Sequence, residues 1–420
     1  MKPQTSALRA GNENEVFGSM AVPLYQSSAY DFKTSEVAAN RFALKELGPI
    51  YTRLNNPTVE VLEKRLAILE KGAASLATAS GQAAIFYAVA NLARAGDNIL
   101  VANKIYGGAT TLLTHTLKNF GIEARLFDSD KANDLEEKID ENSKAIFFES
   151  LSNPHVCICE FETIVKIAKK YSIVTICDNT VATPTLCNPL ELGCDIVVHS
   201  ISKYIGGQGL CIGGALIERE GLNSLLINNP KYPQFNTPDP SYHGLVYADL
   251  PFPIFTLRAR LSLLRDLGAS IAPFNAWQFI QGLETLAIRM RAISDSALKV
   301  ATYLSENENV KLILYPGLKT DPSHEKLCKY FNSTLSSGLI HLELKDENLA
   351  KELVDKTKLF SVVVNIGDSK SLITHPASTT HQQLSKEALN EQGINPKVVR
   401  LSIGLEDPQD LIEDLKNILG

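Results

Sequence analysis

Lys203 is the residue of this sequence best placed for covalent chemistry. It lies in the segment SISKYIGGQG, with Ser200 and Ser202 before it and Gly206 and Gly207 after it. In a phosphate-binding P-loop the glycines precede the lysine, so this is not that motif. The order instead suits a lysine amine that condenses with a carbonyl cofactor, beside hydroxyls that hold a phosphate. Taken alone, Lys203 is more commonly a surface lysine.

Two other candidates follow apolar runs that predict buried strands. Asp178 comes directly after Ile173–Cys177, where an unpaired charge is costly and requires a cationic or hydrogen-bonding partner. The alternative is an aspartate that caps the next turn. Tyr106 follows Ile99–Ala102, and its ring could stack on a planar ligand or simply be a partly buried surface tyrosine.

A phosphate site is predicted where Ser80, Gly81 and Gln82 open a helix after the run Ser75–Ala79. Free backbone N–H groups and the helix dipole favour an anion there, and a glycine permits close approach. The alternative is a serine that only caps the helix. Asn153 follows a further run, and precedes Pro154.

These residues together suit pyridoxal phosphate. Lys203 matches the aldehyde, Asp178 the ring nitrogen and Tyr106 the ring face, while the phosphate falls to Ser80, Gly81, Gln82, Ser200 and Ser202. The cofactor accepts electrons only while its ring nitrogen is protonated, and a buried carboxylate keeps it so. Such a charged hydrogen bond contributes about 1.5–3 kcal/mol.

The residues around these candidates predict a parallel α/β sheet. Strand-like and helix-like segments alternate from about Thr58 to Glu218, and ligands of such sheets bind beyond the carboxyl ends of the strands. The predicted strands are Ser75–Ala79, Ile99–Ala102, Glu123–Phe127, Ala145–Glu149, Ile173–Cys177, Ile196–His199 and Gly214–Ile217. The first predicted helix starts near Pro57 and ends before Gly72. The next ones are Gln82–Arg94, Gly108–Asn119 and Phe161–Lys170.

Three parts of the chain are expected. Residues 1–57 are polar and turn-rich and predict an arm that lies on another surface, residues 58–260 the cofactor-binding domain, and residues 261–420 a C-terminal domain. A long helix, Asn275–Leu304, leads to more antiparallel strands such as Gly338–Leu344 and Val398–Ile403. The Pro- and Tyr-rich insertion, residues 228–253, cannot be a regular element, and we expect it to help close the site.

Composition excludes several classes of protein. The 420 residues are 45% hydrophobic and 21% charged, as in an ordinary globular protein, and the net charge of -6 makes nucleic acid a poor partner. No apolar run is long enough for a membrane span, and residues 1–15 lack a secretion signal, so we expect a cytoplasmic protein. The seven cysteines are odd in number and scattered, which predicts reduced thiols and no metal site.

The sequence resembles the Cys/Met-metabolism family of pyridoxal-phosphate enzymes over nearly its whole length. The matching stretches are YTRLNNPT from Tyr51, ATASGQAA from Ala77, Asn153-Pro154, TICDNT from Thr175, DIVVHSISKYIGG from Asp195 and VRLSIGLED from Val399. The resemblance implies an α/β fold of the aspartate-aminotransferase type (type I). Such a fold has a mostly parallel seven-stranded sheet and a smaller α+β C-terminal domain.

The same resemblance implies a role for each matching residue. Lys203 would bond to the cofactor and Tyr106 would stack on it, both as catalytic residues, while Asp178 would pair with the ring nitrogen. Tyr51 and Arg53 match a Y-x-R pair that reaches the cofactor of a neighbouring subunit, which implies a homo-oligomer, a tetramer built as a dimer of dimers. Ser80, Gly81, Gln82, Asn153, Ser200 and Ser202 would complete the cofactor site, and Arg400, Asn365 and Tyr51 the substrate site, with Arg400 on the substrate carboxylate.

Two features resemble the O-acetylhomoserine sulfhydrylase branch of this family. They are the insertion with TPDPSYHGLVYA and the run RDLGASIAPFNAWQFIQGLETL, and the stretch NIGDSKSLITHPASTTHQQLS from Asn365. The reaction implied is γ-replacement, in which O-acetylhomoserine and sulfide, or a thiol, give homocysteine, or methionine, and acetate. His155, Cys157 and Cys159 depart from the family pattern and receive no role.

Several alternatives stay open at this level. A cystathionine γ-synthase, a methionine γ-lyase, a sulfhydrylase that takes sulfur from a protein thiocarboxylate, and a protein that binds the cofactor without turnover all share these residues. Neither the choice between acetyl and succinyl esters nor the sulfur donor is encoded in any residue identified above.

Overall fold

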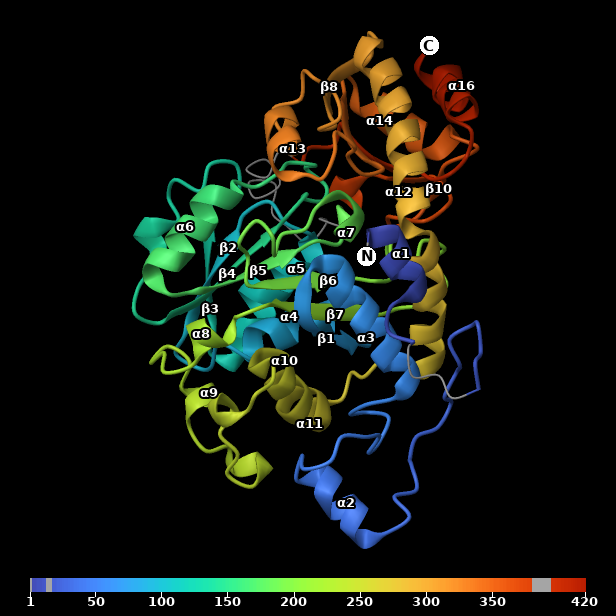
Figure 1. Cartoon of the computed structure of the whole chain (residues 1–420). Coiled ribbons are helices and arrows are strands. Elements are labelled where there is room, and N and C mark those ends of the chain that lie inside the picture. Colours follow the sequence, from blue (N-terminus) through green and yellow to red (C-terminus); the bar gives the residue numbers. More distant parts are fainter. Residues whose placement is uncertain (1, 13–16, 380–393) are drawn as a thin grey trace.

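The computed structural model describes residues 2–12, 17–379 and 394–420, and contains a large and a small β-sheet (Figure 1). The large sheet has seven strands in the order β1-β7-β6-β5-β4-β2-β3. Their bounds are β1 Gly72–Thr78, β2 Asn98–Ala102, β3 Glu123–Phe127, β4 Ser143–Glu149, β5 Val174–Asp178, β6 Ile196–His199 and β7 Gly214–Arg219. Each matches a predicted strand to within a few residues.

Strand direction follows the expected mostly parallel pattern. The pairs β3–β2, β2–β4, β4–β5 and β5–β6 are parallel, and β7 is antiparallel to both β6 and β1. Every residue of β2, β4 and β6 is buried, as expected for a sheet with helices on both faces. The carboxyl ends of the parallel strands therefore share one edge, at which the predicted polar residues lie.

The helices between these strands differ from prediction in three details. The helix predicted as Gln82–Arg94 ends at Ala90. Helix α3, Pro57–Glu70, ends before Gly72 as predicted, but the left-handed residue that caps it is Lys71, and Gly72 already begins β1. The segment predicted as one helix after Tyr106 consists of α5, Gly107–Thr111, and two irregular helical turns that end at Phe120. The other helices here are α4 Gly81–Ala90, α6 Phe161–Tyr171, α7 Thr183–Leu186, α8 Asn223–Leu226, α9 Pro233–Asn236, α10 Ile254–Arg258 and α11 Arg265–Leu267.

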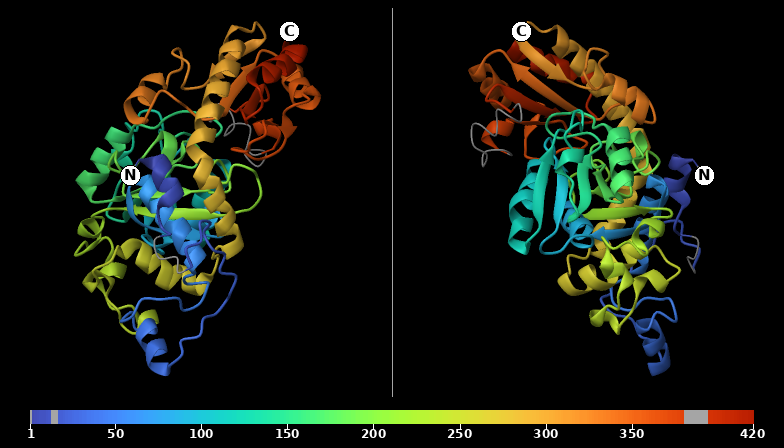
Figure 2. Two further views of the ribbon diagram at one scale, coloured as in Figure 1. Left: turned by 45° about the vertical axis from the view of Figure 1, so that its right-hand side comes forward. Right: turned by 90° about the vertical axis from the view of Figure 1, so that its left-hand side faces the viewer.

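Helix α12, Pro273–Glu306, connects the two sheets and is about 50 Å long at 1.5 Å per residue (Figure 2). Its first half packs in the core of the large sheet through residues such as Phe279, and its last turns pack in the small-sheet core through Leu304. The small sheet has the order β10-β11-β12-β9-β8. Its elements are β8 Val310–Leu314, α13 His324–Tyr330, β9 Leu339–Leu344, α14 Glu347–Lys356, β10 Ser361–Val362, β11 Leu372–Thr374, β12 Val398–Ser402 and α16 Pro408–Leu419.

The first 57 residues contain two short helices, α1 Pro3–Arg9 and α2 Ser35–Phe42. Arg65 on α3 holds the end of α1 by donating through Nε to the carbonyl of Ala10 at 3.0 Å. The chain then runs away from the body to α2, at the bottom of Figure 1. In the described ranges, no helix combines the length and apolar character that a bilayer crossing requires.

Candidate active site

A cavity lies where the carboxyl ends of the large sheet's strands meet the small sheet. Eleven of the residues predicted for the site line it: Ser80, Gly81, Gln82, Tyr106, Asn153, Asp178, Ser200, Ser202, Lys203, Asn365 and Arg400. They come from the ends of strands and from loops spread over 320 residues of sequence. The structure thus brings these residues together, as the parallel-sheet rule predicts.

Lys203 enters the cavity from the loop after β6. Its Nζ donates to Asn365 Oδ1 at 2.5 Å. Burial, and secondarily the positive charge of Arg400, lower the pKa of the Lys203 amine from its usual 10.5 to about 8. A larger fraction of the amine is therefore uncharged near neutral pH than on a surface lysine, and the uncharged amine is the nucleophile.

Arg400 is fixed by the alternation of strand β12. Val399 and Leu401 face the apolar core of the small sheet, so Arg400 between them points to the opposite face. Its Nη1 donates to Asn153 Oδ1 at 3.0 Å and its Nη2 to the backbone carbonyl of Asn365 at 2.8 Å. The Nε group is buried and has no partner among the described residues. A guanidinium held in this way retains a donor for an anion such as a carboxylate.

The turn from β1 into α4 forms one wall of the cavity, with Ser80, Gly81 and Gln82. Ser80 caps the helix, because its Oγ accepts from the backbone N–H of Ala83 at 3.1 Å. A Cβ on Gly81 would lie 2.6 Å from the Cβ of Ser200, so only glycine fits there. Ser202 Oγ accepts from Gly213 N–H at 2.9 Å. The capping role and the proposed phosphate role of Ser80 are thus compatible.

Asp178 and Tyr106 line the same cavity as this turn and Lys203. Asp178 accepts from the backbone N–H of Thr180 at 2.9 Å, and burial raises the pKa of its carboxyl group. Tyr106 is 40% exposed, and its ring lies so close to Gly108 that a Cβ there would approach it to 2.5 Å. Pyridoxal phosphate fits a cavity with these three features: a buried carboxylate that needs a cationic partner, an exposed aromatic ring face, and a turn that can hold an anion.

Glu149 was missed by the sequence analysis. This last residue of β4 lines the cavity, is 4% exposed and pairs in register with Asp178 on β5. The signal that identified Asp178, a carboxylate at the carboxyl end of an apolar strand, applies equally to Glu149. Other lining residues not predicted are apolar or small: Ile85, Leu151, Thr180, Val181, Ile212, Val364 and Ile366.

Tyr51 and Arg53 lie elsewhere, on the arm. Arg53 stacks over the ring of Tyr51 at 5.2 Å, and Tyr51 is 41% exposed. Neither residue lines the cavity in the described part of this chain. Their assignment to a neighbouring subunit's site remains a prediction.

The cysteines near Asn153 are poor nucleophiles. Burial raises the pKa of Cys157 to about 12 and that of Cys159 well above its usual value. Both remain thiols at physiological pH, in agreement with giving them no role.

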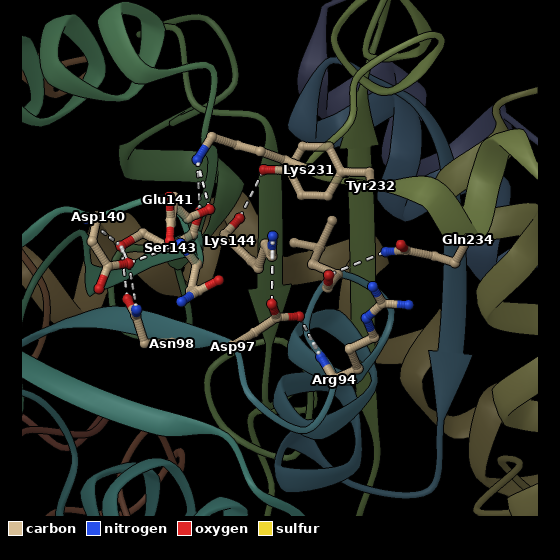
Figure 3. A network of polar contacts seen from close by, with 12 residues as sticks. Arg94, Asp97, Asn98, Asp140, Glu141, Ser143, Lys144, Lys231, Tyr232 and Gln234 are labelled. Carbon is tan, nitrogen blue, oxygen red and sulfur yellow. Dashed lines mark hydrogen bonds and ion pairs between the residues drawn. The ribbon is translucent and has the colours of Figure 1, made fainter.

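The Pro- and Tyr-rich insertion contributes no residue to the lining of the cavity in its own chain, so the expected closure does not occur within one subunit. Tyr232 donates through its hydroxyl to the carbonyl of Lys144 at 2.8 Å (Figure 3). It also accepts from Val174 N–H at 2.9 Å. These are the amino ends of β4 and β5, at the edge of the sheet opposite the cavity. As expected, the insertion has no long regular element, since α9 and single helical turns alternate with coil.

Comparison with known proteins places this geometry in a family. The family model of Cys/Met metabolism PLP-dependent enzymes matches residues 4–420. The O-acetyl-L-homoserine sulfhydrylase of Leptospira meyeri is 43% identical over all of this chain and 96% of its own length, and the O-acetyl-L-homoserine sulfhydrylase 1 of Thermus thermophilus is 40% identical over both whole chains.

A solved structure resembles this one throughout. It is described as an O-acetylhomoserine (thiol)-lyase from Campylobacter jejuni, is 54% identical, and superposes with a TM-score of 0.98 over 100% of both chains. That crystal structure holds a lysine bearing a pyridoxyl 5'-phosphate group. Of the sulfhydrylase-like stretch from Asn365, residues 380–385 lie outside the described residues. With the whole chain matched in sequence and in fold, this protein belongs to the Cys/Met metabolism family of pyridoxal-phosphate-dependent enzymes.

Proposed function

We propose that this chain catalyses γ-replacement, converting O-acetylhomoserine and sulfide to homocysteine and acetate. The bond from Cγ to the acetate oxygen breaks, acetate leaves with the electron pair, and a C–S bond forms at the same carbon. The names of full-length relatives at 40–43% identity support this substrate pair. A thiol in place of sulfide would give methionine.

One observation carries the proposal: Lys203 and Arg400 are joined through a single residue. Asn365 accepts from the lysine amine with its side chain and from the guanidinium with its backbone carbonyl. An amino acid whose carboxylate binds Arg400 would therefore present its Cα near the amine of Lys203. Fixing these two groups relative to one another is the positional requirement for proton transfer at Cα.

Pyridoxal phosphate fits the remaining residues and supplies an electron sink when bound. Ser80, Gly81, Gln82, Ser200 and Ser202 would hold its phosphate. Asp178 would hold the proton on its ring nitrogen, Tyr106 would cover its ring, and Asn153 would line its pocket.

In this proposal Lys203 moves the protons. Its amine, with a pKa near 8, can take protons from Cα and Cβ before acetate leaves from Cγ, and can return them to both carbons after sulfide has added. The apolar lining residues, such as Ile85 and Ile366, exclude water that would otherwise compete with sulfide.

The arm, residues 1–57, would complete the site of a neighbouring subunit with Tyr51 and Arg53, and Tyr51 would also contact that subunit's substrate. We further propose a division at residues 57 and 260 into arm, cofactor-binding domain and C-terminal domain, and a cytoplasmic homotetramer. The exposed apolar side chains of the arm, Phe17 and Leu47 among them, support a partner surface.

The deciding assay compares homoserine esters and sulfur-containing co-substrates with the purified holoenzyme. O-acetylhomoserine with sulfide should release acetate and homocysteine in equal amounts, faster than O-succinylhomoserine does. Faster product formation with cysteine as acceptor would indicate a cystathionine γ-synthase, and dominant breakdown of methionine a γ-lyase. If turnover occurred only with a protein thiocarboxylate, that protein rather than free sulfide would be the sulfur donor.

A further inference from the structure

We propose that Glu149 is a positioning residue whose single carboxylate fixes both the aromatic wall and the substrate-carboxylate clamp of the cavity. Its Oε1 accepts from the backbone N–H of Tyr106 at 2.8 Å, and its Oε2 accepts from the backbone N–H of Asn153 at 3.1 Å. Tyr106 and Asn153 belong to loops after different strands, β2 and β4. One side chain therefore sets the distance between them.

The second contact extends to the substrate site. Asn153, held at its backbone by Glu149, accepts from Arg400 Nη1 with its side-chain oxygen at 3.0 Å. On its other side the same loop is held by His341, whose Nδ1 contacts the carbonyl of Pro154 at 3.2 Å. The loop that orients the guanidinium is thus fixed from the large sheet by Glu149 and from the small sheet by His341.

The two carboxylate oxygens of Glu149 are both required because they face two N–H donors. A glutamine has one acceptor oxygen, and its amide nitrogen would face the second N–H group and leave it unsatisfied. An unpaired buried donor is costly, so the loop on that side is expected to move. The register pairing of Glu149 with Asp178 also places a second carboxyl group beside the residue proposed for the cofactor nitrogen.

The test compares Glu149→Gln with Glu218→Gln in the holoenzyme. Glu218 on β7 is a matched control, since it is buried and accepts from the backbone N–H of Thr256 at 2.9 Å but does not line the cavity. Glu149→Gln should raise KM for O-acetylhomoserine about 10-fold, and Glu218→Gln less than about 2-fold. Sulfide KM should change little in either variant.

A second readout does not depend on catalysis, because the KM prediction rests on the proposed function. Hydrogen exchange of the cofactor-free protein should be faster in residues 103–112 and 150–158 of Glu149→Gln, and unchanged there in Glu218→Gln. Faster exchange without O-acetylhomoserine turnover would support Glu149 as a positioning residue while overturning the proposed substrate. Unchanged exchange in a folded Glu149→Gln variant would overturn the positioning role itself.

A double-mutant cycle adds a third criterion. Asn153→Ala removes the side-chain acceptor of Arg400 but keeps the backbone N–H that Glu149 holds. If Glu149 acts through Asn153, the fold-increase in KM of the double variant should be smaller than the product of the fold-increases of the two single variants. Fully additive changes would mean that Glu149 acts by another route and would contradict the proposal.

Discussion

The amine of Lys203 and the side-chain oxygen of Asn365 lie 2.5 Å apart, although 162 residues of sequence separate them. Lys203 comes from the large sheet and Asn365 follows β10 of the small sheet. This contact therefore joins the two halves of the cavity at the amine itself. The position and the charge state of Lys203 therefore depend on the position of the small sheet relative to the large sheet.

Asn365→Asp should raise the pKa of the Lys203 amine, because a negative charge at hydrogen-bond distance favours the ammonium form. Asn365→Ala should slow catalysis without the same loss of substrate affinity, since the backbone carbonyl that holds Arg400 remains. The pH dependence of the reaction of the cofactor-free protein with pyridoxal phosphate measures the first effect, and the separate kcat and KM values of the holoenzyme measure the second. Equal pH profiles for wild type and Asn365→Asp would contradict the assigned contact.

Arg400→Lys should raise KM for O-acetylhomoserine by about 10- to 150-fold, the equivalent of 1.5–3 kcal/mol for one charged hydrogen bond. A lysine keeps the charge but lacks the planar fork that now contacts Asn153 and Asn365. Steady-state kinetics with both substrates tests this. Sulfide has no carboxylate, so its KM is the internal control and should stay within about 2-fold of wild type. Equal increases for both substrates would point to general misfolding.

The cofactor-free protein should react with pyridoxal phosphate at a rate that rises with pH through a midpoint near 8. The folded pKa of Lys203 is about 8 and its usual value is 10.5, so between these values the unfolded chain binds the additional proton. The contribution of Lys203 to the free energy of unfolding therefore increases as the pH rises from 8 to 10.5. Below pH 8 the buried Lys203 lowers the free energy of unfolding by its full amount. Stopped-flow absorbance across pH 6–11 measures the midpoint, and a midpoint above 10 would show that the amine is not buried.

Arg400→Met tests the second cause of that shift. Removing the positive charge should move the midpoint upward, but not to 10.5, because burial is the larger cause. Lys203→Ala is the control for both experiments and should abolish the visible band of the bound cofactor. A band that survived in Lys203→Ala would identify a different attachment residue.

Mixing Arg53→Ala and Lys203→Ala proteins should restore activity if the arm completes a neighbour's site. In a mixed dimer one site has both wild-type residues and the other has neither. Random exchange gives half mixed dimers with one intact site each, or about a quarter of wild-type activity. Mass spectrometry confirms that subunits have exchanged, and no recovery after confirmed exchange would count against shared sites.

The insertion should stabilise the arm rather than the cavity. Tyr242 donates through its hydroxyl to the carbonyl of Phe42 on α2 at 2.9 Å, while Arg265 lies 5.2 Å over its ring. Tyr242→Phe should therefore increase hydrogen exchange of residues 35–51 about 2- to 10-fold, as expected for one lost hydrogen bond. Tyr247→Phe is the control, because that hydroxyl contacts Asp239 within the insertion. The same increase in both variants would show that the arm is not anchored through Tyr242.

The sequence alone determined the elements and the chemistry of single residues. Apolar runs located the central strands of the large sheet, because a strand covered on both faces must be apolar throughout. The edge strand β3, with Glu123 and Arg125, is only partly buried and does not follow this rule. The rule that ligands bind at the carboxyl ends of parallel strands selected Asp178 and the turn at Gly81. The same rule applies to Glu149 at the end of β4, which the sequence analysis did not select.

Only the tertiary structure decided which of these residues lie in contact, and at which edge of the large sheet each segment lies. Strands β8, β10 and β11 are partly exposed or two to three residues long, so their pairing rather than their own pattern makes them strands. The insertion lies at the far edge of the sheet because Tyr232 hydrogen-bonds the amino ends of β4 and β5. The contacts from Glu149 through Asn153 to Arg400 join residues up to 251 positions apart. Sequence spacing carries no information about such distances, since packing of the two sheets around α12 creates them.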